Sequence, residues 1–420
     1  MKKTRITLFF LLLGTLFLTG ACKSPGKTKE DASLKVRDIF AGVSNVFILR
    51  EDGTLWSAGY NRSGQLGLGE PKSPVLEQNT SEDDVSWGIV QTGEGDNFLG
   101  VKYVAAGEYH TVILKDDGTL WAAGESPFGE LGLGSNGPSR LSTFTPLNDS
   151  GGTAITGVQS VCAGNNSTFF IKNDGTLWAA GYNYYGELGL GDRESRPAFT
   201  QVPVQDVKAA AAGARHTVIL KNDGTVWTAG YNFNGQLAQS ADMDSYGFDQ
   251  VKDLSQAAAV AAGNYHTVIL KSDGTVWAAG QNYYGQLGTS GGRDSRRMVQ
   301  VKDDAGQPMA DAAEIAARGD MTMILKKDGT LFWAGTYAEP LYDNSFEPPP
   351  DNASPEPTFV QLKPEDGASL GKIKKIVLGY RNIYVITADG HLWAAGSSQY
   401  GQISADQDSD ASLALKQIYP

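Results

Sequence analysis

The stretch VAAGNYHTVILKSDGTVWAAG, residues 260–280, contains the pattern that decides the fold. Thr267–Lys271 is a β-branched and aliphatic run that predicts a strand, and Ser272-Asp273-Gly274 predicts a turn because Asp-Gly tolerates the positive φ of tight hairpins. Thr275–Gly280 then returns as a second strand, with a tryptophan large enough to fill the gap between neighbouring sheets. The upstream Ala-Ala-Gly segment predicts a strand of small residues, which suits a crowded place such as the inner end of a sheet.

The Asp-Gly-Thr-Leu/Val-Trp phrase occurs seven times along the chain. The copies lie roughly 50 to 65 residues apart, a period typical of arrays of supersecondary units. The sixth copy has Phe332 in the tryptophan position with Trp333 beside it, and the seventh has His391 in place of threonine. The glycines of the seven Asp-Gly turns are Gly53, Gly118, Gly175, Gly224, Gly274, Gly329 and Gly390.

The repeats predict an all-β, seven-bladed β-propeller over residues 34–420. Each copy provides four short strands, counting upstream segments such as Phe199–Val204, and no convincing amphipathic helix. The C-terminal segment Leu413–Tyr419 resembles the outer strand that would begin other repeats. We therefore expect this segment to complete the first blade, which would leave no open sheet edge at the seam.

The first 22 residues predict a bacterial export signal. A basic start, MKKTR, precedes a short apolar run that ends in Thr19-Gly20-Ala21-Cys22. The position of Cys22 resembles the lipobox of bacterial lipoproteins, although Thr19 stands where such boxes usually have leucine; simple cleavage is the alternative. Residues 23–33 are polar, with Pro and Gly, and predict a flexible tether. We expect an exported protein, lipid-anchored through Cys22 to the cell membrane or outer membrane of a bacterium.

Composition restricts the class of partner. The net charge of −12 disfavours a broad basic surface for nucleic-acid phosphates, so we expect no nucleic-acid partner. The only cysteine besides Cys22 is Cys162, so a lipidated chain could form no internal disulfide and would depend on its core. We expect a monomer without a cofactor.

Loops that follow the tryptophan strands complete the repeat. They include NRSGQLGLG at 61–69 and NYYGELGLG at 183–191, with shorter forms beginning at Asn232 and Asn282. Together with the Asp-Gly-Thr-Leu-Trp and Ala-Ala-Gly-x-x-His phrases, they resemble the repeat of the regulator of chromosome condensation family over about residues 34–420. The resemblance implies a seven-bladed propeller that acts through protein contacts. Some members are nucleotide exchange factors for a small GTPase, but an export signal is inconsistent with that role here.

Residues of metal-binding or catalytic type do not form a convincing set in the sequence. His110, His216 and His266 occupy equivalent repeat positions, one per copy, and we expect each to bond neighbouring backbone rather than a metal. The Asp-Gly aspartates are explained by hairpin turns, and Cys162 by a small buried side chain. We find no nucleophile with a plausible elbow and base, and therefore expect no enzyme.

Bulky side chains recur in the loops after the tryptophan strands. If the repeats are equivalent, these side chains lie on one rim of the ring, where rigid aromatic groups are good interface anchors; packing between blades is the alternative. Insertions at 70–100, which contains Trp87, and at 337–371 are candidate binding loops or linkers without function. The predicted rim residues are Phe128, Tyr184, Tyr185, Phe233, Tyr283, Tyr284 and Tyr400.

The sequence therefore predicts a membrane-anchored scaffold that binds an unidentified protein outside the cytoplasm. The alternative is a carbohydrate-binding protein or enzyme that uses the mouth of the central channel. Carboxylates and aromatic rings at the mouth would favour the alternative, whereas an alanine-lined channel with aromatic rings on the rim would favour protein binding.

Overall fold

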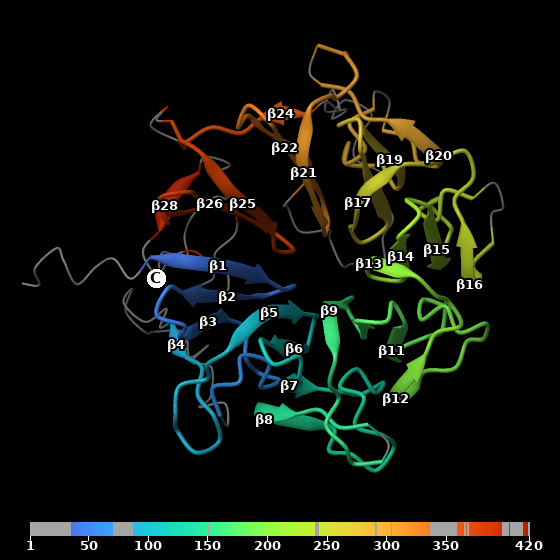
Figure 1. The fold of residues 1–420 in the computed structure, drawn as a ribbon. Helices are drawn as coiled ribbons and strands as arrows, with labels where there is room; N and C mark the ends of the chain where they lie inside the picture. The colour runs from blue at the N-terminus through green and yellow to red at the C-terminus, as the bar shows by residue number, and fades with distance from the viewer. Residues whose placement is uncertain are drawn as a thin grey trace, which may run out of the picture. The chain divides into compact units, whose positions relative to one another are not determined.

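The computed structural model describes residues 35–69, 87–149, 151–239, 243–289, 292–303, 305–336, 359–364, 367, 369–396, 403 and 415–418. Lys35–Pro420 forms one compact unit, distinct from Met1–Leu34. Within the described ranges this unit contains seven four-stranded antiparallel sheets, which we call blades 1 to 7 in chain order (Figure 1). In those same ranges, no helix has both the length and the apolar character needed to cross a membrane.

The strands follow one another in order within each blade. Blade 1 has β1 (Val36–Ala41), β2 (Asn45–Arg50), β3 (Leu55–Gly59) and β4 (Gly88–Ile89). Blade 2 has β5 (Val101–Ala106), β6 (His110–Lys115), β7 (Leu120–Glu125) and β8 (Arg140–Pro146). Blade 3 has β9 (Val158–Ala163), β10 (Ser167–Lys172), β11 (Leu177–Gly181) and β12 (Arg196–Gln201). Blade 4 has β13 (Val207–Ala212), β14 (His216–Lys221), β15 (Val226–Gly230) and β16 (Ser245–Gln250).

The remaining three blades repeat this pattern. Blade 5 has β17 (Ala257–Ala262), β18 (His266–Lys271), β19 (Val276–Gly280) and β20 (Ser295–Gln300). Blade 6 has β21 (Ala312–Arg318), β22 (Asp320–Lys326), β23 (Leu331–Thr336) and β24 (Val360–Gln361). Blade 7 has β25 (Ile373–Leu378), β26 (Asn382–Thr387), β27 (Leu392–Gly396) and β28 (Lys416–Ile418). The predicted seven-bladed propeller is therefore confirmed.

The Asp-Gly turns of blades 1 to 5 are each fixed by a short hydrogen-bond chain. In blade 4, Asp223 accepts hydrogen bonds from the backbone N and the Oγ1 of Thr225, at 2.9 and 2.6 Å. Thr225 Oγ1 in turn accepts a bond from Trp227 Nε1 at 3.0 Å, and Lys221 Nζ lies 5.2 Å from the Trp227 ring centroid. The bonds from Thr225 lower the pKa of Asp223. The turn residue Gly224 has φ +80°, as the hairpin requires.

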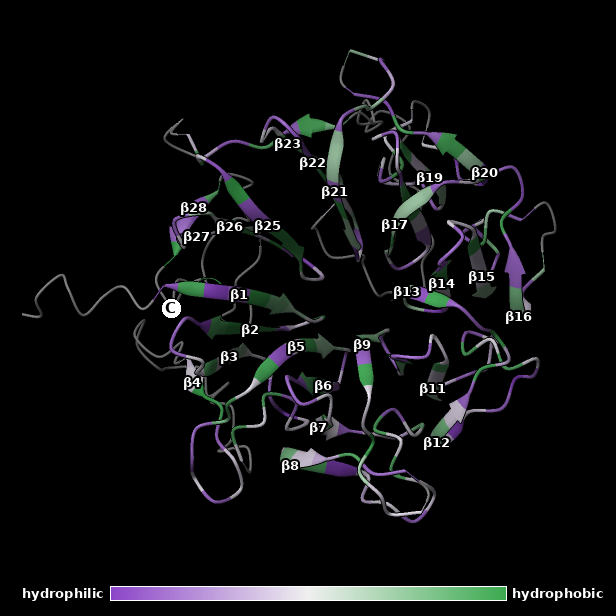
Figure 2. Ribbon diagram, in the orientation of Figure 1, coloured by the Kyte–Doolittle hydropathy of each residue, from purple (hydrophilic) through white to green (hydrophobic). Residues whose placement is uncertain are grey.

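The inner strands of neighbouring blades pack closely. A Cβ atom added at Gly213, just after β13, would lie 2.4 Å from the carbonyl oxygen of Gly263 in blade 5. Such a contact is too short for any side chain, so the small residues of the Ala-Ala-Gly segment are required there. Figure 2 shows hydrophobic residues gathered in the strands and hydrophilic residues in many of the connecting loops.

The repeated histidines join one blade to the next. His216 Nε2 lies 3.1 Å from Thr267 Oγ1, and that hydroxyl donates its own proton to the carbonyl oxygen of Gln236 at 2.7 Å. Because the hydroxyl proton is already used, the histidine Nε2 must carry the hydrogen of the first bond. His110 and His266 make the corresponding contacts at 2.9 Å. The structural role was predicted, and the threonine hydroxyl of the next blade is a partner that the sequence did not indicate.

The predicted seam is wrong. The C-terminal strand β28 pairs with β27 and completes blade 7, whereas blade 1 uses its own β4. The outer strand of each blade follows its own tryptophan strand, because the connecting loop returns it antiparallel to that strand. Blades 7 and 1 are instead joined by side chains. Lys375 Nζ contacts Asp38 Oδ1 at 2.6 Å, and Tyr384 packs in one core cluster with Ile39.

Candidate functional site

The loops after the tryptophan strands share one internal frame. In blade 3, Asn183 Oδ1 accepts a hydrogen bond from Leu188 N, and Glu187 Oε2 accepts one from Tyr185 N, both at 2.9 Å. Both acceptor side chains are buried beneath the loop. The frame repeats in blades 4 and 5 with glutamine in place of the glutamate. These bonds fix the loop backbone that carries Tyr184 and Tyr185, so little loop freedom remains to be lost on binding.

An arc of aromatic rings crosses the loop side of blades 2 to 5, and we call it the aromatic rim. Tyr185 contacts Tyr184 at a centroid distance of 5.1 Å within blade 3, and Tyr231 of blade 4 at 5.0 Å. These contacts join rings from separate repeats into one surface. The rim consists of Phe128, Tyr182, Tyr184, Tyr185, Tyr231, Phe233 and Tyr265.

A cation lies within the aromatic rim. The Arg215 guanidinium is 5.0 Å from the Tyr185 ring centroid and 5.9 Å from that of Tyr231, and its Nη1 donates to Tyr185 Oη at 3.2 Å. Burial raises the pKa of the nearby Glu187 carboxyl to about 7, while Arg215 acts in the opposite direction. Arginine and tyrosine, with tryptophan, are enriched at the energetic centres of protein interfaces.

The predicted rim residues differ in their surroundings. Phe128, Tyr184 and Phe233 are exposed by 42, 53 and 65%, and Tyr185 is half-buried between blades. Tyr283 and Tyr284 of blade 5 form a second edge-to-face pair at 4.8 Å. Some of the predicted loop aromatics are therefore exposed on the rim, whereas others pack between blades.

Other predicted site residues lie elsewhere or outside the described residues. Trp87 is half-buried against the core cluster of blades 1 and 7. Cys22, Tyr400 and most of the two insertions fall outside the described residues. Of the first insertion, the structure describes residues 87–100, which include β4.

Four members of this surface were not predicted from the sequence. Tyr182 and Tyr231 each directly follow the glycine that ends a tryptophan strand, and Arg215 and Tyr265 precede the repeated histidine. The repeat alignment carries a signal for the first pair, since Tyr60 occupies the same position in the first copy. Their contact across blades could not be predicted, because it depends on how far each loop leans toward the next blade.

The inner strands enclose a central channel with a cavity of about 300 Å³. Blades 4 and 5 line it with alanines and one valine, Val260. Polar and charged groups come from blades 2, 3, 6 and 7, and they are Tyr103, Cys162, Glu314, Arg318 and Lys375. Burial raises the pKa of the Cys162 thiol to about 12, which leaves little reactive thiolate at neutral pH.

The described residues contain no group of three or more histidine, cysteine or acidic side chains that could hold a metal ion. The three repeated histidines are buried one per blade and engaged with threonine hydroxyls. The arrangement that the structure does offer is a rigid aromatic surface on one side of the ring and a narrow channel through its centre.

Comparison with known families supports the assignment made from the repeats. The RCC1-like domain matches residues 96–336, more than half of the chain. The regulator of chromosome condensation (RCC1) repeat matches residues 36–65 and 373–402, in blades 1 and 7.

Curated relatives share part of their length with the chain. The ultraviolet-B receptor UVR8 of Arabidopsis thaliana is 30% identical over 41% of this chain and 35% of its own length. The regulator of chromosome condensation of Xenopus laevis is 26% identical over 40% of this chain and 36% of its own. The chain thus spans about a third of the length of these two relatives.

Solved structures share the fold at low sequence identity. Human WBSCR16 superposes with a TM-score of 0.68 at 16% identity, covering 87% of this chain and 94% of that one. Yeast RCC1 superposes with a TM-score of 0.65 at 17% identity, covering 97% of this chain and 91% of the other. At these identities the likeness concerns the fold alone.

Proposed function

Because the chain belongs to the RCC1-like domain family, we propose that it is a protein-binding scaffold whose contact surface is the aromatic rim. An RCC1-like propeller fits a role in protein interaction. The single observation that carries the proposal is the continuous arc of rings around Arg215, with Phe233 exposed by 65% at one end. A rigid surface of tyrosine, phenylalanine and arginine offers a large contact area at low entropic cost.

We further propose that the scaffold acts outside the cytoplasm, anchored through lipid on Cys22. The support is the export signal and the small residues before that cysteine. A Cys22→Ser variant expressed in bacteria should lose metabolic labelling by palmitate and move from the membrane to the soluble fraction. Retention of the label by this variant would contradict the anchor.

The contact surface is tested by placing a photo-crosslinking amino acid at Phe233 and identifying the captured protein. The purified partner is then titrated against the wild type and a Tyr184→Ala, Phe233→Ala variant. Removal of two rim anchors should weaken binding at least about tenfold. Unchanged affinity would contradict the rim as the contact surface.

The matched control is Leu99→Ala. Leu99 is 50% exposed and lies next to Gly53 in the Asp-Gly turn of blade 1, at the opposite end of the strands from the loops of the rim. This control removes exposed apolar area without touching the rim, so it should bind as the wild type does. Equal thermal stability of the three proteins ensures that affinity, and not folding, is compared.

A further inference from the structure

One arginine stands where the other blades have glycine. The residue three positions before the repeated histidine position is glycine in six blades, but Arg318 in blade 6; the six are Gly42, Gly107, Gly164, Gly213, Gly263 and Gly379. At Gly107 an added Cβ would lie 2.8 Å from the Gly164 carbonyl oxygen. In blade 6 the backbone departs from this arrangement, because Arg318 pairs with Met321 and Gly319 turns with φ +57°.

The Arg318 side chain crosses the channel. Its Nη2 donates a hydrogen bond to the carbonyl oxygen of Ala106, at the end of β5, at 2.7 Å. Blade 2 is three blades from blade 6 in one direction around the ring and four in the other, so the bond joins nearly opposite walls. The guanidinium therefore lies across the end of the channel that faces the aromatic rim.

The charge of Arg318 is not balanced by a carboxylate among the described residues. Its one side-chain hydrogen bond is to a neutral carbonyl, and burial lowers its pKa to about 10. Of the acids on the inner strands, Asp38 is paired with Lys375 at 2.6 Å, and burial raises the pKa of Glu314 to about 6. Arg318 is half-buried and its one hydrogen bond is to a neutral carbonyl, so its charge is left unbalanced and an anion at this point would stabilise the folded protein.

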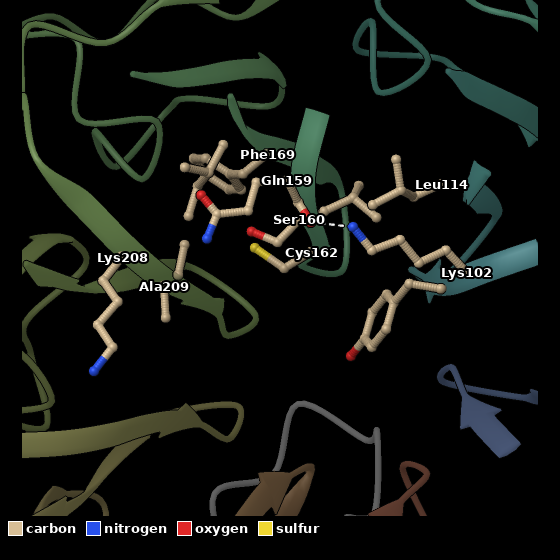
Figure 3. A pocket seen from close by; sticks show the side chains of 12 residues that line it. Lys102, Leu114, Gln159, Ser160, Cys162, Phe169, Lys208 and Ala209 are labelled. Atoms are coloured by element: carbon tan, nitrogen blue, oxygen red, sulfur yellow. Dashed lines mark hydrogen bonds between the residues drawn. The ribbon is translucent and has the colours of Figure 1, made fainter. Parts of the chain in front are cut away.

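Four cations stand at the opposite end of the channel, which they share with acidic residues of the Asp-Gly turns such as Asp223 and Asp273. Exposed cations occupy the second position of the inner strand in four blades, and they are Arg37, Lys102, Lys208 and Lys374. Lys102 and Lys208 line a cavity of about 330 Å³ that shares Tyr103, Cys162 and Ala210 with the channel. Figure 3 shows the two lysines on either side of the strand that carries Gln159 and Ser160. Such a mouth attracts anions.

We propose that the channel binds a small organic carboxylate, which enters past the lysines and is held by the Arg318 guanidinium. Because one Nη of the guanidinium bonds Ala106, the remaining N–H groups are left for a planar carboxylate. Tyr103 lines the same cavity as Arg318 and brings a hydroxyl donor to it. The cavity has room for a molecule of several non-hydrogen atoms.

The test is isothermal titration of succinate into the detergent-solubilised full chain at low ionic strength. Arg318→Gly restores the residue found in six blades, and Arg318→Lys retains the charge without the planar fork. We expect saturable binding by the wild type, at least about tenfold weaker in Arg318→Gly and intermediate in Arg318→Lys. Succinate should also raise the melting temperature of the wild type but not that of Arg318→Gly.

Two controls separate this site from the rim. The Tyr184→Ala, Phe233→Ala variant should bind succinate as the wild type does, whatever its affinity for a protein partner. Inorganic phosphate is titrated alongside. Equal succinate binding by wild type and Arg318→Gly, or no saturation of the wild type, would overturn the proposal. Tighter binding of phosphate than of succinate would overturn the carboxylate assignment.

Discussion

The buried histidines make a quantitative prediction about acid stability. Burial lowers the pKa of His216 to about 4, from an ordinary value of 6.5. Because the folded pKa is the lower one, the unfolded chain binds the proton more tightly. The contribution of this histidine to stability is complete above pH 6.5 and decreases as the pH falls toward 4. Each pKa unit corresponds to about 1.4 kcal/mol, so acidification from pH 7.5 to 5.0 should remove about 2 kcal/mol through His216 alone.

The perturbation is His216→Asn, which places in blade 4 the residue that blades 1 and 7 have at this position, Asn45 and Asn382. The variant loses the bond to Thr267 and should be less stable at pH 7.5, by about 1 to 3 kcal/mol. It does not carry the buried imidazole, so it also loses the acid sensitivity of that group. Its stability deficit relative to the wild type should therefore shrink by about 2 kcal/mol at pH 5.0.

The assay is urea unfolding followed by tryptophan fluorescence at both pH values and constant ionic strength. All other titrating groups are common to the two proteins, so they cancel in the difference between them. Thr267→Val is the control, since it removes the hydroxyl partner but leaves the imidazole buried. This control should be destabilised and should retain the wild-type acid sensitivity. A wild-type to His216→Asn gap that is the same at both pH values would refute the reasoning.

Three further predictions concern the rim, the blade packing and the seam. Glu187→Gln should stabilise the protein by up to about 3 kcal/mol at pH 8 and by little at pH 4.5, measured by urea unfolding. Burial raises the pKa of Glu187 to about 7, so its ionisation opposes folding as the pH rises from 4.5 to 7. Gly213→Ala should lower the melting temperature by several degrees, because its Cβ meets a carbonyl of blade 5, while Gly247→Ala, with open space around it, should change it little. Deletion of residues 411–420 removes β28 and the buried Leu415, and should cost about 3 kcal/mol or more; an unchanged melting temperature would show that blade 7 does not need its outer strand.

The sequence predicts the ring because each copy carries the same local chemistry. The Asp-Gly turn, the threonine beside it and the tryptophan are bonded to one another within a few residues, as Asp223, Thr225 and Trp227 show. Such contacts survive transfer from one copy to another, so seven phrases predict seven blades. The seam was mispredicted because tertiary packing, and not the local sequence, decides which strand an outer strand pairs with. The residues of 413–419 have strand character but carry no signal that distinguishes β27 from a strand of blade 1.

The aromatic rim shows the same limit. Its loop tyrosines were predicted from their repetition, whereas the ring contacts between Tyr185 and Tyr231 and the placement of Arg215 depend on the angle between blades 3 and 4. Periodicity indicates which residues are equivalent. It does not indicate which equivalent residues of neighbouring blades are in contact.

In a seven-fold repeat, departures from the pattern carry information of their own. Six copies define what the position of Arg318 ordinarily requires, and five of the six glycines have a neighbouring atom within 2.8 Å of an added Cβ. At this position even the Cβ of an alanine or serine would strain the backbone. An arginine fits only because the turn is changed, and Gly319, with its positive φ, provides that change. Loss of the requirement for glycine at this position does not explain the bond from Arg318 to Ala106. It also does not explain the four cations at the other end of the channel. Blade 6 therefore combines a reshaped turn, a crossing guanidinium and an unbalanced charge, and a bound carboxylate would balance that charge.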